Sequence, residues 1–199
     1  MTNPRQQIKQ IPPDIVNKRF EFVKNKPLKQ NLANTLSYIT FLDSLEEALE
    51  LPKLYKTQIY KTIIIFSAAI VESLLHYKLK ELINEGEVKN EDIFRKKFKY
   101  EEMSKVMLLE EIPYSIVLCK KLPLVQELKN STHSNETIQC AKRCGLLTPR
   151  LHELCTEIKD LRNKLHMAAM IDLDDQYTRK AMEEVFKKVK KIIVRIEKF

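Results

Sequence analysis

The sequence of 199 residues contains only 2 glycines and no tryptophan. Glycine supplies the left-handed backbone conformations that many turns and β-bulges require, so its scarcity argues against a protein built mainly from sheet. It also argues against nucleotide loops, and the sequence contains no glycine-rich phosphate loop, HExxH motif, nucleophile elbow or Rossmann fingerprint. Because Leu, Ile, Lys and Glu are abundant, the composition predicts an all-α protein.

The sequence also lacks the pattern of a signal peptide and the length of a membrane span. Residues 1–10 are polar and have no apolar core. The most apolar run, residues 62–71, is too short to cross a bilayer, and Lys61 and Glu72 flank it. We therefore expect this run to be a buried helix in a cytoplasmic protein that has no membrane partner.

The sequence has four cysteines, at Cys119, Cys140, Cys144 and Cys155. Their number permits disulfides, but a large core without a secretory signal favours free thiols. Cys140 and Cys144 are four residues apart, with His133 and His152 nearby in the sequence, so zinc binding is possible in principle. Paired CxxC spacing is lacking, and small buried thiols explain the same residues, so we expect no metal and no other cofactor.

The charge of the chain is strongly positive, with a formal net charge of +8 at pH 7. Such an excess favours an anionic partner, and nucleic acid before an acidic protein or a membrane surface. The alternative is a soluble protein that is merely basic. Composition alone does not decide between the two.

Hydrophobic periodicity predicts helices along most of the chain. We expect a single compact domain, with residues 1–54 as an N-terminal arm and helical elaboration and residues 55–199 as the helical bundle proper. In the first half of the chain we expect a helix that starts at Pro12–Pro13, a helix over Leu28–Leu42, a short helix from a Ser44/Glu47 capping box to Leu51, and a long helix over Tyr55–Asn84 that Gly86 closes. Two short helices are expected at 92–98 and 100–109. The remaining expected helices are Ser115–Leu128, Glu136–Cys144, Thr148–Met170 and Asp175–Lys198.

The expected Thr148–Met170 helix carries the first candidate site. Its apolar stripe recurs at spacings of three and four, and Arg162 and His166 lie four apart at the border of that stripe. An arginine pairs well with a phosphate, and a histidine transfers protons near neutral pH, so the two supply what phosphodiester chemistry without a metal needs. Asn163 is placed to orient the histidine or to hold a substrate oxygen. The alternative is a solvated helix edge or a packing detail.

Glu72 interrupts the apolar surface of the expected Tyr55–Asn84 helix, and His76 follows one turn later. A carboxylate in an apolar setting is costly unless it is paired. We expect Glu72 to face Arg162 or His166 across the bundle and to fix their geometry. The alternative is that Glu72 lies at a wet edge of the helix.

Three features together resemble the HEPN superfamily of compact α-helical bundles, over about Tyr55–Phe199. They are the central helix with Glu72 and His76, the late helix with Arg162, Asn163 and His166, and an amphipathic terminal helix after an Asp-rich break. Many HEPN proteins are metal-independent ribonucleases in toxin–antitoxin, abortive-infection and CRISPR-associated systems. Their motif usually has roughly four to six residues between Arg and His, whereas this sequence has a shortened Arg-x3-His form.

The resemblance implies a metal-independent endoribonuclease, such as a toxin or a phage-defence effector, that cleaves RNA by attack of the 2′-hydroxyl. Arg162 and His166 would be catalytic, and Asn163 and Glu72 would position the substrate and the arginine. It also implies a homodimer with two motifs facing one cleft, and possible pairing with a cognate antitoxin protein. The alternative is a non-catalytic HEPN-like module that binds RNA or a partner protein.

Basic residues near this motif are the candidates for contact with the RNA backbone. The last helix is rich in lysine and arginine, and a basic strip beside the Arg–His helix would suit phosphates, although a solvated face explains the same pattern. The lysines expected to bind RNA are Lys159, Lys164, Lys187 and Lys191.

Overall fold

The computed structural model describes residues 11–108, 115–164 and 177–199. In these residues the protein is mostly helical, as predicted, and the exception is one β-hairpin. The described elements, in chain order, are α1 (Pro13–Lys18), α2 (Lys26–Ala48), α3 (Lys53–Asn84), α4 (Asn90–Ile93), β1 (Lys97–Leu108), β2 (Ser115–Leu124), α5 (Ser134–Arg143), α6 (Pro149–Asn163) and α7 (Arg179–Lys198).

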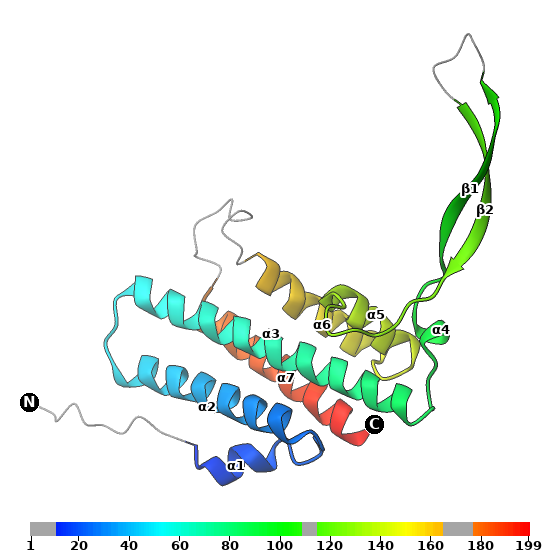
Figure 1. Cartoon of the computed structure of the whole chain (residues 1–199). Coiled ribbons are helices and arrows are strands. Elements are labelled where there is room, and N and C mark those ends of the chain that lie inside the picture. The colour runs from blue at the N-terminus through cyan, green and yellow to red at the C-terminus, as the bar shows by residue number, and fades with distance from the viewer. Residues whose placement is uncertain (1–10, 109–114, 165–176) are drawn as a thin grey trace, which may run out of the picture.

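Helix α3 is the centre of the bundle and contacts α2, α5, α6 and α7 (Figure 1). Apolar residues on several of its sides, including Ile63, Leu74 and Leu79, are fully buried. A helix that is apolar nearly all round can be stable in water only when neighbours cover most of its surface. Helix α2, from the N-terminal 54 residues, contributes Ile39 and Leu42 to the same core.

The length and hydropathy of α3 would allow it to cross a membrane, but half of its most apolar window is buried inside the protein. The core helix of a soluble protein has this same character. The packing around α3 is therefore consistent with the buried helix predicted from residues 62–71.

Several helix ends lie where the sequence predicts them. Thr148 caps α6, because its hydroxyl accepts a hydrogen bond from the Leu151 amide at 3.3 Å, and Pro149 is the first helical residue. Gly86 follows α3 with a φ of +75°, and the Glu87 amide donates to the Leu82 carbonyl at 3.0 Å. Only glycine adopts such a left-handed conformation without strain, so this end of α3 is fixed locally.

Helix α2 corrects one prediction. The chain is helical without interruption over Lys26–Ala48, so Ser44 and Glu47 form no capping box and no separate short helix begins there. The first turn contains Pro27, and Asn25 caps it by accepting from the Leu28 amide at 2.9 Å. Helix α2 thus begins with a proline in its first turn, two residues before the expected start at Leu28.

The β-hairpin is the larger correction, because helices were expected over 92–98, 100–109 and Ser115–Leu128. Instead, β1 and β2 pair antiparallel, from Lys97 opposite Leu124 to Leu108 opposite Ser115. Phe98 and Tyr100 alternate with Lys97 and Lys99, which is the period of two typical of a strand. That alternation is short, and the pairing that stabilises it joins two consecutive strands, a contact that the helical pattern within either segment does not reveal.

Helix α6 ends, and helix α7 begins, at residues other than those predicted. Helix α6 ends at Asn163 with Lys164 as its C-cap, and residues 165–170 of the expected helix lie outside the described residues. Helix α7 begins at Arg179, because the Thr178 hydroxyl accepts from the Ala181 amide at 3.2 Å and caps it. Its predicted amphipathic character is confirmed, because an apolar seam spaced four, three, four and three residues apart is buried or packed on the core: Met182, Phe186, Val189, Ile193 and Ile196.

Candidate functional site

The candidate site is built on an ion pair between two helices that are far apart in the sequence. Arg162, in the last turn of α6, donates a hydrogen bond through Nη1 to Glu72 Oε1 in the middle of α3. The side chains are 31% and 29% exposed, so both charges are largely covered by protein. The predicted contact between Glu72 and Arg162 is therefore confirmed, and Glu72 is not a fully wet edge residue.

An open pocket with a volume of about 400 Å³ lies beside Glu72. Helix α3 contributes Glu72, Ser73, His76 and Lys80 to its wall, the segment before α5 contributes Asn130 and Thr132, and α5 begins at Ser134 in the same wall. Most of these side chains carry hydrogen-bonding groups, so the pocket suits a polar or anionic ligand better than an apolar one.

His76 lies at the edge of this pocket and is held there by a contact to backbone. Its Nε2 lies 3.0 Å from the carbonyl oxygen of Lys129, so Nε2–H is the donor and Nδ1 carries the lone pair in the neutral ring. Lys80 is fixed nearby, with its Nζ 2.7 Å from Asn130 Oδ1. The four-residue spacing of Glu72 and His76 in a helix was the signal that could have placed His76 among the candidate site residues.

The other predicted site residues of α6 are not part of the Arg162–Glu72 ion pair. Asn163 and Lys164 are exposed at the end of α6. The Lys159 side chain is only 15% exposed, and its Nζ lies 3.2 Å from both Asn135 Oδ1 and Asp160 Oδ1, so this lysine is already engaged. Its availability to RNA is correspondingly reduced. His166 lies outside the described residues, and the predicted Arg162–His166 geometry stays a prediction.

The other two lysines predicted to bind RNA lie on α7. Lys187 and Lys191 are exposed and lie four residues apart, hence on one face. Between them in sequence, Lys188 Nζ pairs with Glu157 Oε2 of α6 at 2.7 Å and ties the two helices together. Helix α7 therefore packs alongside α6, as the predicted basic strip requires, and Lys187 and Lys191 remain exposed for contact with an RNA backbone.

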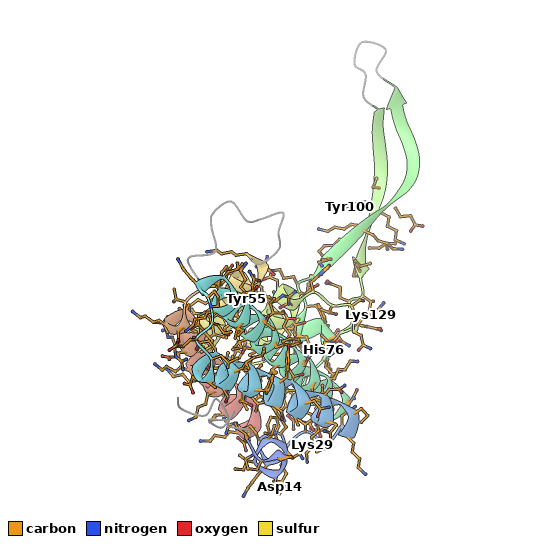
Figure 2. The ribbon with its side chains drawn as sticks, turned by 90° about the vertical axis from the view of Figure 1, so that its left-hand side faces the viewer. Asp14, Lys29, Tyr55, His76, Tyr100 and Lys129 are labelled. Atoms are coloured by element: carbon orange, nitrogen blue, oxygen red, sulfur yellow. The ribbon has the colours of Figure 1, made fainter. Side chains whose placement is uncertain are left out.

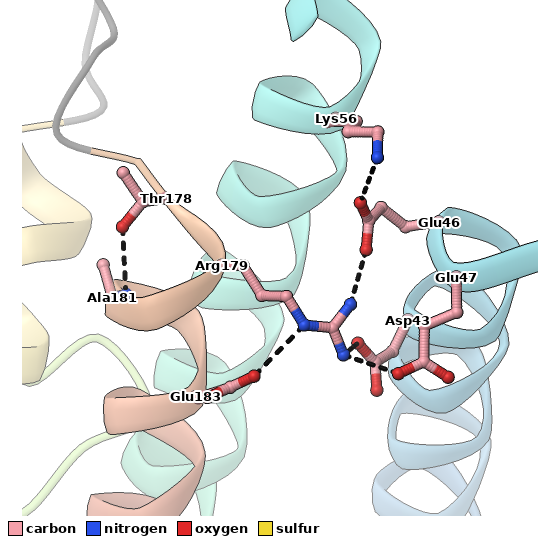
Figure 3. Close-up of polar contacts among 8 residues, drawn as sticks. All are labelled: Asp43, Glu46, Glu47, Lys56, Thr178, Arg179, Ala181 and Glu183. Atoms are coloured by element: carbon pink, nitrogen blue, oxygen red, sulfur yellow. Dashed lines mark hydrogen bonds and ion pairs between the residues drawn. The ribbon is translucent and has the colours of Figure 1, made fainter. Parts of the chain in front are cut away.

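A second charged cluster joins α2 to the start of α7 (Figure 3). Arg179 binds Glu46 and Glu47 at 2.6 Å each and Glu183 at 3.1 Å, while Lys56 binds Glu46 at 3.0 Å. The Glu46 side chain is only 5% exposed, and such a buried carboxylate needs these partners.

The pKa values in this cluster follow from burial and pairing. Burial raises the pKa of Glu46, but hydrogen bonds to Lys56 and Tyr60 and the charges of Lys56 and Arg179 outweigh it, so the net pKa is lowered. Burial and the bond to Glu46 raise the pKa of Tyr60 to about 12. Because the carboxylates turn toward two cations, we interpret the cluster as a structural clasp.

The two buried cysteines, Cys140 and Cys155, are poorly suited to act as nucleophiles. All four are free, and burial raises the pKa of Cys140 to about 11 and that of Cys155 to about 12, so both stay thiols at neutral pH. The ring Nε2 of His152 is 3.0 Å from the Gln139 amide nitrogen, and burial lowers its pKa. Within the described ranges, no three His, Cys, Asp or Glu side chains are grouped to hold a metal ion.

No family model matches the chain, and comparison with known proteins and with solved structures finds no match. The likeness to HEPN proteins thus rests on the residues quoted above.

Proposed function

We propose that this protein is a metal-independent endoribonuclease of HEPN type, acting in the cytoplasm as a toxin or phage-defence effector. The observation that supports it is the Arg162–Glu72 pair, which anchors a guanidinium on the bundle next to a polar pocket. An arginine held in a fixed orientation loses little entropy when it binds a phosphate, which favours catalysis by electrostatic stabilisation.

In the proposed reaction, the RNA 2′-oxygen bonds to the neighbouring phosphorus while the bond to the 5′-oxygen breaks. The proton of the 2′-hydroxyl goes to a general base, and the leaving 5′-oxygen takes a proton from a general acid, so that a cyclic phosphate and a 5′-hydroxyl form. His166 is assigned to proton transfer, and Arg162 stabilises charge on the phosphoryl oxygens. Asn163 positions the phosphate, Glu72 orients Arg162, and the reaction needs no metal.

The proposal includes a homodimer in which two Arg162–His166 pairs line one cleft. One arginine and one histidine make a thin site, and a second copy doubles the positive field that attracts RNA. Lys164, Lys187 and Lys191 are exposed and are assigned to the RNA backbone, with Lys159 contributing only if it leaves Asn135. A cognate antitoxin protein is the further partner proposed.

One observation favours a second candidate, a non-catalytic module that binds RNA or a partner protein. The charge of Arg162 is already matched by Glu72, so a phosphate must compete with a carboxylate for the guanidinium. A module that used Arg162 only to join α6 to α3 would show the same contact.

Incubation of the purified protein with total RNA in EDTA separates the two candidates. The nuclease proposal expects cleavage by the wild type and roughly a 100-fold or greater loss in Arg162→Ala and in His166→Ala. The matched control is Arg150→Ala, because Arg150 lies on the same helix but is 73% exposed and pairs only with Glu153 among the described residues. Cleavage that survives both site substitutions would reject the assignment.

A further inference from the structure

The β-hairpin is an arm that projects away from the helical bundle (Figures 1 and 2). Its strands pack chiefly against each other. Hydrogen bonds hold its root: the Gln126 side-chain amide donates to the Arg95 carbonyl across the root, and the Leu128 amide donates to Asn90 Oδ1 of α4 at 3.3 Å. Arg143 of α5 donates to the Ile93 carbonyl and so ties α4 to the bundle. The arm therefore starts from a fixed position and presents its outer part to solvent.

The strand register places two aromatic rings on one face of the arm. Phe98 and Tyr100 are two residues apart, so their side chains project on the same side, and Pro123 and Lys121 stand opposite them on β2. The residues Phe98 and Tyr100 are 43% and 67% exposed. Lys121 Nζ lies 4.1 Å from the centre of the Phe98 ring, so a cation accompanies the aromatic pair.

A groove of about 600 Å³ lies at the root of the arm, next to these rings. Its apolar walls are Phe98, Pro123, Leu124 and Val125, of which Leu124 is 45% and Val125 83% exposed. The other lining residues include four cations and one acid, namely Lys89, Arg95, Lys96, Lys97 and Glu91. Exposed apolar surface inside a basic rim fits a ligand that has both flat apolar faces and negative charge.

We propose that this aromatic face and basic groove bind single-stranded RNA, with bases stacking on Tyr100 and Phe98 and phosphates contacting Arg95, Lys96 and Lys121. Unpaired bases expose the faces that stack on aromatic side chains, whereas the bases of a duplex are covered by their neighbours. The choice of RNA as the nucleic acid rests on the proposed function. The stacking and charge argument rests on the arm alone.

Binding is tested by fluorescence anisotropy with a labelled oligouridine of about 16 nucleotides. The protein carries His166→Ala, so that cleavage cannot obscure binding. We expect the double variant Phe98→Ala/Tyr100→Ala to bind roughly tenfold or more weakly. We also expect Lys96→Ala to lower the salt dependence of binding. The matched control is Tyr55→Ala, because Tyr55 is a 59% exposed tyrosine on α3, away from the arm (Figure 2).

A second variant guards against misfolding of the strands. Replacing residues 98–123 with Asn-Gly closes the chain at the directly paired Lys97 and Leu124 and removes the arm. This variant should keep the urea midpoint of the bundle and lose binding as the double variant does. Unchanged RNA affinity in both variants would overturn the proposal. Removal of the arm that dissociates a dimer but leaves the RNA affinity unchanged would also overturn it, because the arm would then serve dimer formation. Arm-dependent binding without cleavage by the wild type would reject only the proposed nuclease.

Discussion

Arg162 of α6 and Glu72 of α3 form an ion pair that joins the end of one helix to the middle of the central one. The two residues are separated by 90 positions in the chain, so the contact exists only in the folded bundle. Both side chains are about two-thirds covered, which means that loss of one leaves the other charge short of both water and a partner.

Glu72→Gln should therefore destabilise the protein by about 1 kcal/mol, since the glutamine oxygen still accepts a hydrogen bond but the charge attraction is lost. Urea denaturation of both proteins measures the difference. Glu153→Gln is the control, because the Glu153–Arg150 pair is 58% and 73% exposed and should contribute little. Equal effects of the two substitutions would show that Glu72 does not anchor Arg162.

Arg179→Ala should lower the free energy of unfolding by about 2 kcal/mol, which is more than the effect expected of Glu72→Gln. It leaves Asp43, Glu46, Glu47 and Glu183 near one another without the guanidinium that they share. Arg179→Lys should recover only part of the loss, because an ammonium group cannot present the planar fork. Thermal unfolding of the three proteins provides the comparison, and a wild-type midpoint for Arg179→Ala would contradict the clasp.

Acid should weaken the same clasp. The pKa of Glu46 is lowered from its ordinary 4.5. Outside the clasp, the pKa of Glu81 is lowered too, because hydrogen bonds to Lys78 and Lys24 outweigh its burial. A depressed folded pKa contributes stability that is complete above 4.5 and is lost as the pH falls through the folded value. The urea midpoint should fall below that pH in the wild type, and less steeply in Glu46→Gln.

Asp43 should behave in the opposite way. Burial raises its pKa above the ordinary 3.8, although the charge of Arg179 opposes the shift. The folded state then holds the proton more tightly than the unfolded state. The contribution of Asp43 to the free energy of unfolding is therefore lost as the pH rises through its folded pKa. Asp43→Asn should accordingly gain stability relative to wild type at pH 7 and show no gain in strong acid. A loss at pH 7 would mean that its contact with Arg179 dominates.

The local features of the fold could be predicted from sequence where short segments determine them. The cap at Thr148, the turn at Gly86 and the seam through Ile193 and Ile196 depend only on neighbouring residues. The contact of Glu72 was predictable because a carboxylate in an apolar helix requires a cation, and Arg162 was an available one.

The features that were missed depend on tertiary contacts or on strand pairing, which the residue pattern within one segment does not show. Ser44 and Glu47 have the pattern of a helix start, but α2 continues, and Glu47 binds Arg179, which comes 132 residues later in the sequence. The arm and its groove need Lys97 beside Leu124, a pairing that no local pattern encodes. In the sequence, His76 stands out only because it follows Glu72 by one helical turn. Its place at the pocket depends on its contact with the Lys129 carbonyl, which only the folded structure shows.

The proposed ribonuclease activity is tested most directly by the fate of RNA mixed with the purified protein in EDTA, with Arg162→Ala and Arg150→Ala alongside. We predict cleavage by the wild type and by Arg150→Ala, with products that end in a cyclic phosphate, and roughly 100-fold slower cleavage by Arg162→Ala. Intact RNA with the wild type, or equal cleavage by Arg162→Ala, would contradict the assignment of Arg162 as the catalytic arginine.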